Sequence, residues 1–258
     1  MSPLDTSGLA PTSLAQIDEQ WFNVQRFDKK FVVGITTVKA FIDDHKDVLT
    51  VLDIEGLRTF HYVTEYFDTP ELAFYRDHYM RRKRRLKVRI RHYTDSHRSQ
   101  CEVKARDGKA LTTKFVLPNT EKFEGPAQEF VSDTADMLNM SDRFVGSPSN
   151  LIHSATTTFD RVTINRTDCA EKITIDMNFQ ITAGSHTMSS FPHVALVEVK
   201  STTRRTRTQS DFALLDVFPT SFSKYASALD ILVSARPRVN SRRVLQRVFG
   251  PTSSQLKS

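Results

Sequence analysis

Charged and aliphatic residues alternate in several short segments of the chain. In residues 86–91 every second side chain is a Lys or Arg and the others are aliphatic, so a strand here carries its cations on one face. Residues 102–106 and 196–200 repeat this design. One such strand is typical of a half-exposed sheet, but three favour a closed sheet with its apolar face packed outward against helices. We therefore predict an α+β fold, an antiparallel closed β-barrel with a polar, basic lumen.

The same patterns locate the other elements. Strands are expected at about 26–33, 59–67, 109–117, 153–164 and 171–181, and helices at about 36–45, after 70, and at 127–138, 211–217 and 224–234. Asp68 or Thr69 is expected to cap the helix that follows Pro70. Asp107 and Gly108 between two alternating segments predict a tight hairpin.

Composition and charge narrow the class of protein. The 258 residues are 39% hydrophobic and 26% charged, which is typical of a globular domain. The net charge of +6 favours acidic partners, among them nucleic acid, a membrane surface and phosphorylated small molecules. Cys101 and Cys169 lack metal-site spacing and are expected to be free thiols. Without a signal-peptide pattern or a long apolar run, the sequence predicts a soluble, cytoplasmic protein without a transmembrane segment.

The chain divides into three expected parts. Residues 1–20 are rich in Ser, Pro and Thr and are expected to be disordered, residues 21–235 form the domain, and residues 236–258 form a basic tail. The cationic run 81–85 indicates a solvated loop or, less often, a nucleic-acid surface. Nucleic acid is an unlikely partner, because the aromatic and basic platform of single-strand binders is missing.

Six short motifs carry a resemblance to a known family. They are RFDKKF at 26–31, YFDTP at 66–70, KVRIR at 87–91, EVK at 102–104, EVK at 198–200 and FSKY at 222–225. Their order resembles that of VTC (vacuolar transporter chaperone) domains, the polyphosphate polymerase branch of the triphosphate tunnel metalloenzymes. The resemblance extends over about residues 26–233. It implies a tunnel-shaped barrel that binds nucleoside triphosphate, polyphosphate and a divalent metal, Mn or Mg.

The resemblance also implies site residues. The phosphate-binding set would be Lys30, Arg89, Arg91, Lys104, Arg106, Arg161, Lys172, Ser223 and Lys224. Of these, the catalytic residues would be Arg89, Arg91, Lys104 and Lys224, and the metal ligand would be Glu198.

Three departures from the family pattern bear on this assignment. Lys172 stands where the family usually has Arg, which keeps the charge but loses the two-pronged contact. Ser221 stands where the eukaryotic polymerases have a Lys. The first strand has Arg26, Asp28 and Lys30 in place of the Glu-x-Glu-x-Lys signature of the hydrolase and cyclase branches. That replacement argues against a site dominated by metal-binding carboxylates of the first strand.

The chemistry of phosphoryl transfer suits a basic lumen. It requires in-line positioning and neutralisation of charge, which Arg and Lys supply, while Glu102 is expected to orient neighbouring cations. The resemblance implies a phosphotransferase that passes phosphate from ATP to polyphosphate. A triphosphate or polyphosphate hydrolase and a non-catalytic module for polyphosphate or inositol phosphates remain as alternatives. The phosphate acceptor, the metal and the oligomeric state stay open.

Overall fold

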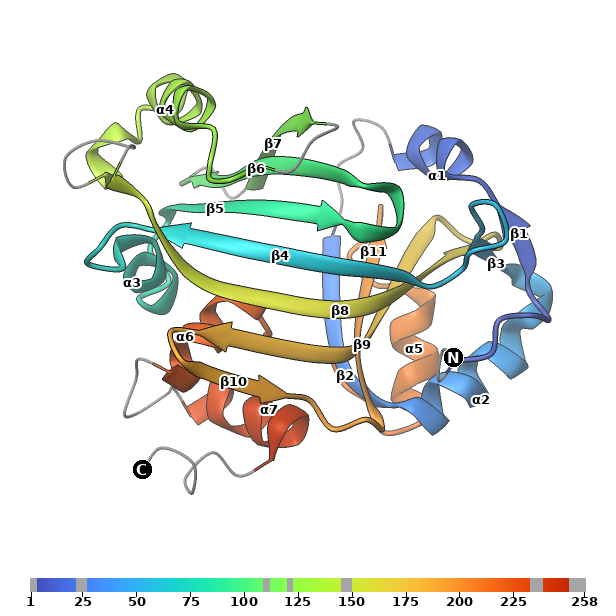
Figure 1. Ribbon diagram of the computed structural model, residues 1–258. Helices are drawn as coiled ribbons and strands as arrows, with labels where there is room; N and C mark the ends of the chain where they lie inside the picture. Colours follow the sequence, from blue (N-terminus) through green and yellow to red (C-terminus); the bar gives the residue numbers. More distant parts are fainter. Residues whose placement is uncertain are drawn as a thin grey trace.

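One large antiparallel sheet organises the chain. The computed structural model describes residues 4–21, 27–108, 112–119, 123–144, 150–232 and 239–250. Eight strands follow one another across the sheet in the order β2-β11-β9-β8-β4-β5-β6-β7, each pair antiparallel (Figure 1). These strands are β2 (Phe27–Gly34), β4 (Phe60–Asp68), β5 (Arg84–Tyr93), β6 (Arg98–Asp107), β7 (Thr112–Asn119), β8 (Ile152–Arg166), β9 (Glu171–Ala183) and β11 (Val194–Ser201).

Three shorter strands complete the sheet. β3 (Leu49–Leu52) pairs with β8 and with β1 (Ala10–Thr12), and β10 (His186–Ser189) pairs with β9. β1 lies in the segment that was expected to be disordered, and no strand was predicted at β10. The fold is therefore mixed α+β with 11 strands in one sheet. Among the described residues no pairing joins β7 to β2, the two ends of the eight-strand order.

The predicted alternation decides which face of each strand is buried. In β5 the aliphatic Leu86, Val88 and Ile90 are almost fully buried, whereas the cations between them are partly exposed. The predicted hairpin is present, since β6 pairs with β7 and Gly108 adopts φ +98°, which favours glycine. Residues 109–111 of that predicted strand lie outside the described residues.

Helices cover the apolar, outer face of the sheet. α2 (Ile35–His45) and α5 (Arg207–Leu214) bury Phe41 and Phe212 against one half of it. α3 (Ala73–Tyr79) and α4 (Gln128–Met137) bury Phe74 and Val131 against the half that contains β5 and β6. Three 3₁₀ turns, at Lys46–Val48, Thr94–Ser96 and Ser141–Arg143, connect elements. α2 begins directly after β2, and its N-cap Gly34 makes no side-chain capping bond.

Two further helices lie against the inner face. α6 (Lys224–Leu232) and α7 (Val239–Phe249) share one apolar cluster with Tyr62, Phe159 and Leu196, which project from the concave side of the sheet. Figure 1 shows these helices beneath β9 and β10. They close one end of the concave surface.

Both ends of the chain correct the expectations for them. In the expected disordered segment, Leu4, Leu9 and Ile17 are buried, the last in α1 (Leu14–Trp21). In the expected basic tail, Leu245 and Val248 of α7 are buried in the core. Isolated apolar residues among Ser, Pro and Arg carry little periodic signal, although tertiary contacts bury them.

Asp68 joins β4 to α3 and α6. Its buried carboxylate accepts the backbone N–H groups of Phe74 and Tyr75, each at 2.9 Å, and the hydroxyl of Tyr225. The prediction that Asp68 or Thr69 is the N-cap residue is wrong, because α3 begins at Ala73 and its N-cap is Leu72. The Asp68 carboxylate nevertheless accepts two N–H groups of the first turn. Burial raises the pKa of Asp68. Hydrogen bonds from the Tyr225 hydroxyl and from the backbone N–H groups of Thr69, Phe74 and Tyr75 oppose that rise.

We expect Asp68→Ala to lower the free energy of unfolding by at least about 3 kcal/mol, because it leaves several buried donors unsatisfied. Urea unfolding of the apo protein measures the loss. Asp44→Ala, at an exposed site on α2, should change it by no more than about 0.5 kcal/mol. Equal effects of the two variants would contradict a role for Asp68 in joining these elements.

Candidate phosphate-binding site

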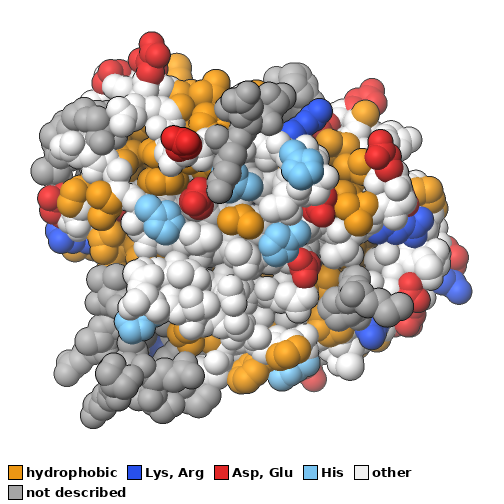
Figure 2. All heavy atoms as spheres, viewed as in Figure 1, with side chains coloured by type: hydrophobic (Ala, Val, Ile, Leu, Met, Phe, Trp, Pro, Cys, Tyr) orange, Lys and Arg blue, Asp and Glu red, His pale blue; other side chains and the backbone are white. Residues whose placement is uncertain are grey.

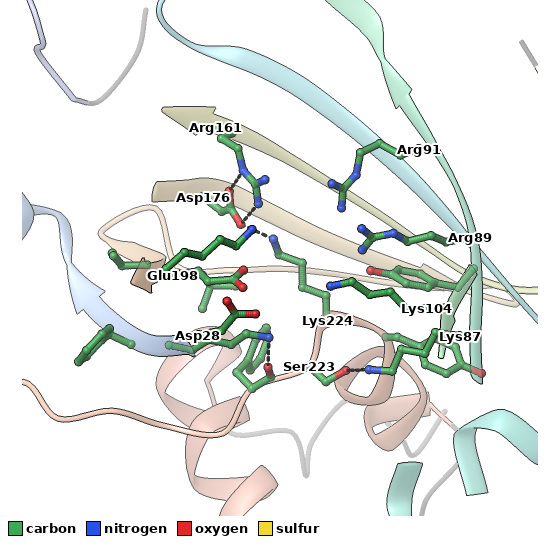
Figure 3. A pocket seen from close by; sticks show the side chains of 18 residues that line it. Asp28, Lys87, Arg89, Arg91, Lys104, Arg161, Asp176, Glu198, Ser223 and Lys224 are labelled. Atoms are coloured by element: carbon green, nitrogen blue, oxygen red, sulfur yellow. Dashed lines mark hydrogen bonds and ion pairs between the residues drawn. The ribbon is translucent and has the colours of Figure 1, made fainter. Parts of the chain in front are cut away.

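The concave face of the sheet surrounds a cavity of about 150 Å³. Residues from seven of the eight path strands line it, together with the start of α6 (Figure 3). Because alternate side chains of each strand point inward, the sheet directs one polar face of every strand to this space. Its cationic lining is Lys30, Lys87, Arg89, Arg91, Lys104, Arg161, Lys200 and Lys224, and its anionic lining is Asp28, Asp176 and Glu198.

The outer surface has a different charge pattern. Figure 2 shows histidines and acidic side chains over the outer face of β4 and β8, with Lys and Arg mainly at its margins. There His61 contacts Asp160 at 2.7 Å, and Asp160 also accepts Asn178. Behind this face, Lys and Arg side chains of the same sheet line the cavity.

Glu102 lies beneath the first pair of cations. Its carboxylate is fully buried and accepts Nε and Nη2 of Arg89, with Nε at 2.7 Å. Nη1 of Arg91 lies 4.0 Å and Nζ of Lys114 lies 3.8 Å from Oε1. Burial alone would raise the pKa of Glu102, but these three cations hold it well below its usual range. As the sequence indicated, Glu102 orients neighbouring cations.

Asp176 organises the opposite wall. It accepts two bonds from the guanidinium of Arg161, at 2.6 and 2.9 Å, and a third from Lys224. Burial opposes its ionisation, yet the two cations lower the pKa of Asp176 to about 2. Aromatic faces support both cations, since Arg161 lies 5.0 Å from the ring centre of Tyr62 and Nζ of Lys224 lies 3.7 Å from that of Phe159.

Burial lowers the basicity of Lys87, Lys104 and Lys224 in the cavity. Burial, with the charge of Arg89, lowers the pKa of Lys104 to about 7, although Glu198 opposes the shift. Burial likewise lowers the pKa of Lys224 to about 7. For Lys87, burial and the neighbouring cations lower the pKa well below its ordinary value. Lys104 and Lys224 are therefore partly neutral at physiological pH.

Glu198 is the candidate metal ligand. Burial disfavours its charge, but Lys200, Lys30 and Lys104 hold its pKa well below the usual range, so it stays ionised. Asp28 is its diagonal neighbour across the β2–β11 pair, and Figure 3 shows both carboxylates on the same side of the cavity. Within the described part of the chain, no three His, Cys, Asp or Glu residues form a preformed metal cage. Two carboxylates fit a Mn or Mg ion that takes its other ligands from water and phosphate.

A second cavity of about 260 Å³ lies between α3 and α6. Arg85 and Arg106, opposite each other in the β5–β6 pair, line it together with His78 and Ser227. Ser223 is the residue that lines both cavities among those described. Two basic chambers thus meet at the start of α6.

The predicted site residues divide between these places. The first cavity brings together Lys30, Arg89, Arg91, Lys104, Arg161, Glu198, Ser223 and Lys224. Arg106 lines the second cavity. Lys172 lines neither, although Lys200, its partner in the β9–β11 pair, lines the first. The cationic run 81–85 is only partly solvated: Arg85 lines the second cavity and Arg82 forms an ion pair with Asp77 at 3.2 Å.

Sequence reasoning missed three functional candidates. Lys87 shares its face with Arg89 and Arg91, so the alternation that identified these arginines also indicates Lys87. Asp176 shares its face with Lys172 in the same way, and it reaches the cavity where Lys172 does not. Asp28 lacked a signal, because it was seen only as a departure from the hydrolase signature.

Comparison with known proteins identifies the family. The sequence profile of the VTC domain matches residues 25–233. The chain belongs to the VTC domain family. A comparison with curated protein sequences gave no match. No helix within the described residues of this VTC domain is long and apolar enough to cross a membrane.

Solved structures of similar proteins are distant. A candidate adenylate cyclase from Bacillus halodurans is 16% identical, with a TM-score of 0.44 over 73% of this chain and 87% of that one. A candidate adenylyl cyclase from Hippeastrum with a dominant triphosphatase activity is 12% identical, with a TM-score of 0.46 over 79% and 95%. A candidate adenylate cyclase from Vibrio parahaemolyticus is 13% identical, with a TM-score of 0.42 over 78% and 95%.

The lowered pKa of Lys104 predicts a pH-dependent stability. Its pKa is about 7 in the folded apo protein and about 10.4 in an unfolded chain, so its charge destabilises the fold most below pH 7. Lys104→Met should therefore be more stable than the wild type at pH 6. This advantage should shrink by up to about 1.4 kcal/mol per pH unit above pH 7.

Urea unfolding of both proteins between pH 6 and pH 9 measures this difference. Lys39→Met, at an exposed site on α2, should show a constant difference over the same range. A constant difference for Lys104→Met as well would contradict the lowered pKa.

Proposed function

We propose that this VTC domain transfers the terminal phosphate of a nucleoside triphosphate, such as ATP, to polyphosphate. The observation that supports this most directly is the convergence of Lys and Arg side chains from opposite halves of one sheet on a single cavity. A polyanion neutralises this excess of cations, which water cannot do in a buried space. In this proposal the β7 and β2 edges meet, so that the curved sheet is a closed barrel and the cavity is part of a tunnel.

The arginines and lysines take different parts in binding. Arg89 and Arg91 project from one strand into the cavity and, as permanent cations, hold phosphate oxygens in planar forks. The Glu102 carboxylate accepts Nε of Arg89, so the guanidinium of Arg89 is oriented before substrate binds. Lys104 and Lys224, with pKa values of about 7, gain their full charge as the phosphates bind.

A divalent metal completes the proposed site. Glu198, with Asp28 beside it, would hold Mn or Mg together with the phosphates, and the bound metal would neutralise charge on the leaving diphosphate. Asp176 is not available for this purpose, because Arg161 and Lys224 already occupy its oxygens. The amino-acid side chains position the phosphates and keep the reacting group in line between the two walls.

The decisive experiment is incubation with ATP and Mn or Mg, followed by separate assays for polyphosphate chains and for free phosphate. Polyphosphate formation supports the transferase. Free phosphate alone would replace it with a hydrolase of the same site. Tight binding of polyphosphate without either product would replace it with a binding module.

Arg89 provides the first test of the site. Arg89→Ala should weaken binding of a non-hydrolysable ATP analogue by about 2–4 kcal/mol, as calorimetry can measure, because a desolvated charged contact is lost. Arg89→Lys should recover only part of this loss, since an ammonium lacks the planar fork. Lys39→Ala, which removes an exposed cation from α2 on the outer side, should bind the analogue normally.

The stability of the apo variants shows whether Arg89 contacts the nucleotide or only supports Glu102. Arg89→Ala leaves the buried Glu102 with more distant cations, so the apo protein should also lose stability. Adding Glu102→Gln should restore much of that stability and none of the affinity. Recovery of both in the double variant would mean that Arg89 acts only as a structural partner of Glu102.

Glu198 provides the second test. Glu198→Gln should keep the fold and raise the metal concentration needed for half-maximal turnover at least about tenfold, because Gln lacks the charge that attracts the cation. In metal-free buffer the variant should bind the ATP analogue no more weakly than the wild type, since a negative charge has gone. Glu129→Gln, exposed on α4, is the matched control. An unchanged metal requirement would place the metal elsewhere.

A further inference from the structure

A row of cations follows the inner face of β5. Its members are every second residue of the strand, Arg85, Lys87, Arg89 and Arg91, and residues on one face lie about 6.8 Å apart along a strand. Lys87, Arg89 and Arg91 line the first cavity, and Arg85 lines the second. The row therefore connects the two cavities.

β6 adds a second row beside the first. In the β5–β6 pair Lys104 lies opposite Lys87, and Arg106 lies opposite Arg85. Nζ of Lys87 donates to Oγ of Ser223 at 3.0 Å, at the point where the two cavities meet. Two adjacent rows of cations fit a linear chain with a negative charge on each unit better than they fit one compact anion.

The second cavity contains an unsatisfied donor. Nε of Arg106 is buried and has no hydrogen-bond partner in the described part of the chain, a cost that an acceptor atom of a ligand would remove. Burial and Arg106 lower the pKa of Arg85, as expected for two neighbouring guanidinium groups with little counter-charge. Asp230 also lines this cavity, but it accepts the hydroxyl of Tyr75 at 2.6 Å. The second cavity therefore favours an anion.

Arg81 extends the positive charge from the second cavity to the surface. It follows the C-cap residue of α3 with φ +55°, a left-handed conformation for which glycine is the usual residue. In spite of that conformational cost, an exposed arginine stands here and lines the cavity. Its neighbours Arg82 and Arg84 are each paired with an aspartate. Arg81 and the exposed Lys83 form no ion pair within the residues that the structure describes, so both are available to a ligand.

We propose that Arg81 and Lys83 form an outer site, continuous with the second cavity, that holds the part of a polyphosphate chain too long for the two cavities. This inference rests on the proposed function, because it extends the path of the same chain. Arg85 lies four residues, about 14 Å, along β5 from Arg89, and Arg81 lies beyond it. A triphosphate held by Arg89 does not reach Arg81, whereas a chain of many phosphates does.

The chemistry of the outer site favours polyphosphate over single-stranded nucleic acid. Residues 80–84 are Met, Arg, Arg, Lys and Arg, and they include no aromatic ring on which a base could stack. A phosphate chain needs only cations and hydrogen-bond donors, which Arg81 and Lys83 supply. The outer site would therefore distinguish long chains from nucleotides by length alone.

The experiment measures binding of two probes to the full chain, tripolyphosphate and a long polyphosphate, by calorimetry without ATP. The wild type should bind the long chain more tightly than tripolyphosphate. The double variant Arg81→Gln, Lys83→Gln should bind the long chain roughly three- to thirtyfold more weakly, the range for two exposed charge contacts. Its affinity for tripolyphosphate should not change, and the salt dependence of long-chain binding should become shallower, because fewer counterions are displaced.

A matched control removes the same charge elsewhere. Arg204→Gln with Arg205→Gln replaces two exposed cations after β11 that line neither cavity. This variant should bind both probes like the wild type. An equal loss of long-chain affinity in the control would mean that only the net charge of the protein matters, and would overturn the outer site.

Three other results would also overturn the outer site and leave the proposed function intact. One is unchanged long-chain affinity in the variant of Arg81 and Lys83, and another is an equal loss for both probes. The third is tighter binding of a single-stranded oligonucleotide than of polyphosphate of equal charge, lost in the same variant, which would assign the segment to nucleic acid. A wild type that binds neither tripolyphosphate nor a non-hydrolysable ATP analogue would instead refute the proposed function itself.

Discussion

The structure depends on how a folded protein holds many positive charges in one buried space. Each lysine or arginine in the cavity has lost water and faces other cations, and both effects disfavour its charge. Glu102, Asp176 and Glu198 offset part of this cost from the floor and walls. They are too few to neutralise the cavity, so the remaining imbalance is an electrostatic preference for an anion. The phosphate affinity that we propose and the electrostatic cost of the empty site would have the same origin.

The alternating strands solve the packing problem that such a cavity creates. Much of the hydrophobic core lies between the outer face of the sheet and helices α2, α3, α4 and α5. On the inner face a second apolar cluster packs against α6 and α7, and the polar side chains of that face line the cavity. α6 lies on the inner side and is bonded to both β4 and β9. Asp68 accepts Tyr225 at one side of this helix, and Asp176 accepts Lys224 at its first residue. These two carboxylates place Ser223 and Lys224 against the cavity floor.

The sequence was sufficient for the strands and for most of the cavity. Alternation is a local property, so the face shared by Lys87, Arg89 and Arg91 could be read without any tertiary information. What alternation does not supply is the position along a strand at which the sheet curves around the cavity. For that reason Lys172 was expected in the site. Asp176, four residues further along β9 on the same face, lines the cavity instead. The register of β9 against β11 and β8 decides this, and register is set by pairing across the chain.

Arginine and lysine then divide the work according to their chemistry. Arg89 and Arg161 keep their charge, because each has a carboxylate within hydrogen-bond distance and a guanidinium hardly deprotonates. Lys104 and Lys224 respond differently, because burial outweighs the nearby carboxylates and lowers their pKa values to about 7. In the proposed function, phosphate binding therefore takes up protons, and its affinity declines as pH rises above 7. A site of arginines alone would bind phosphate without this proton uptake.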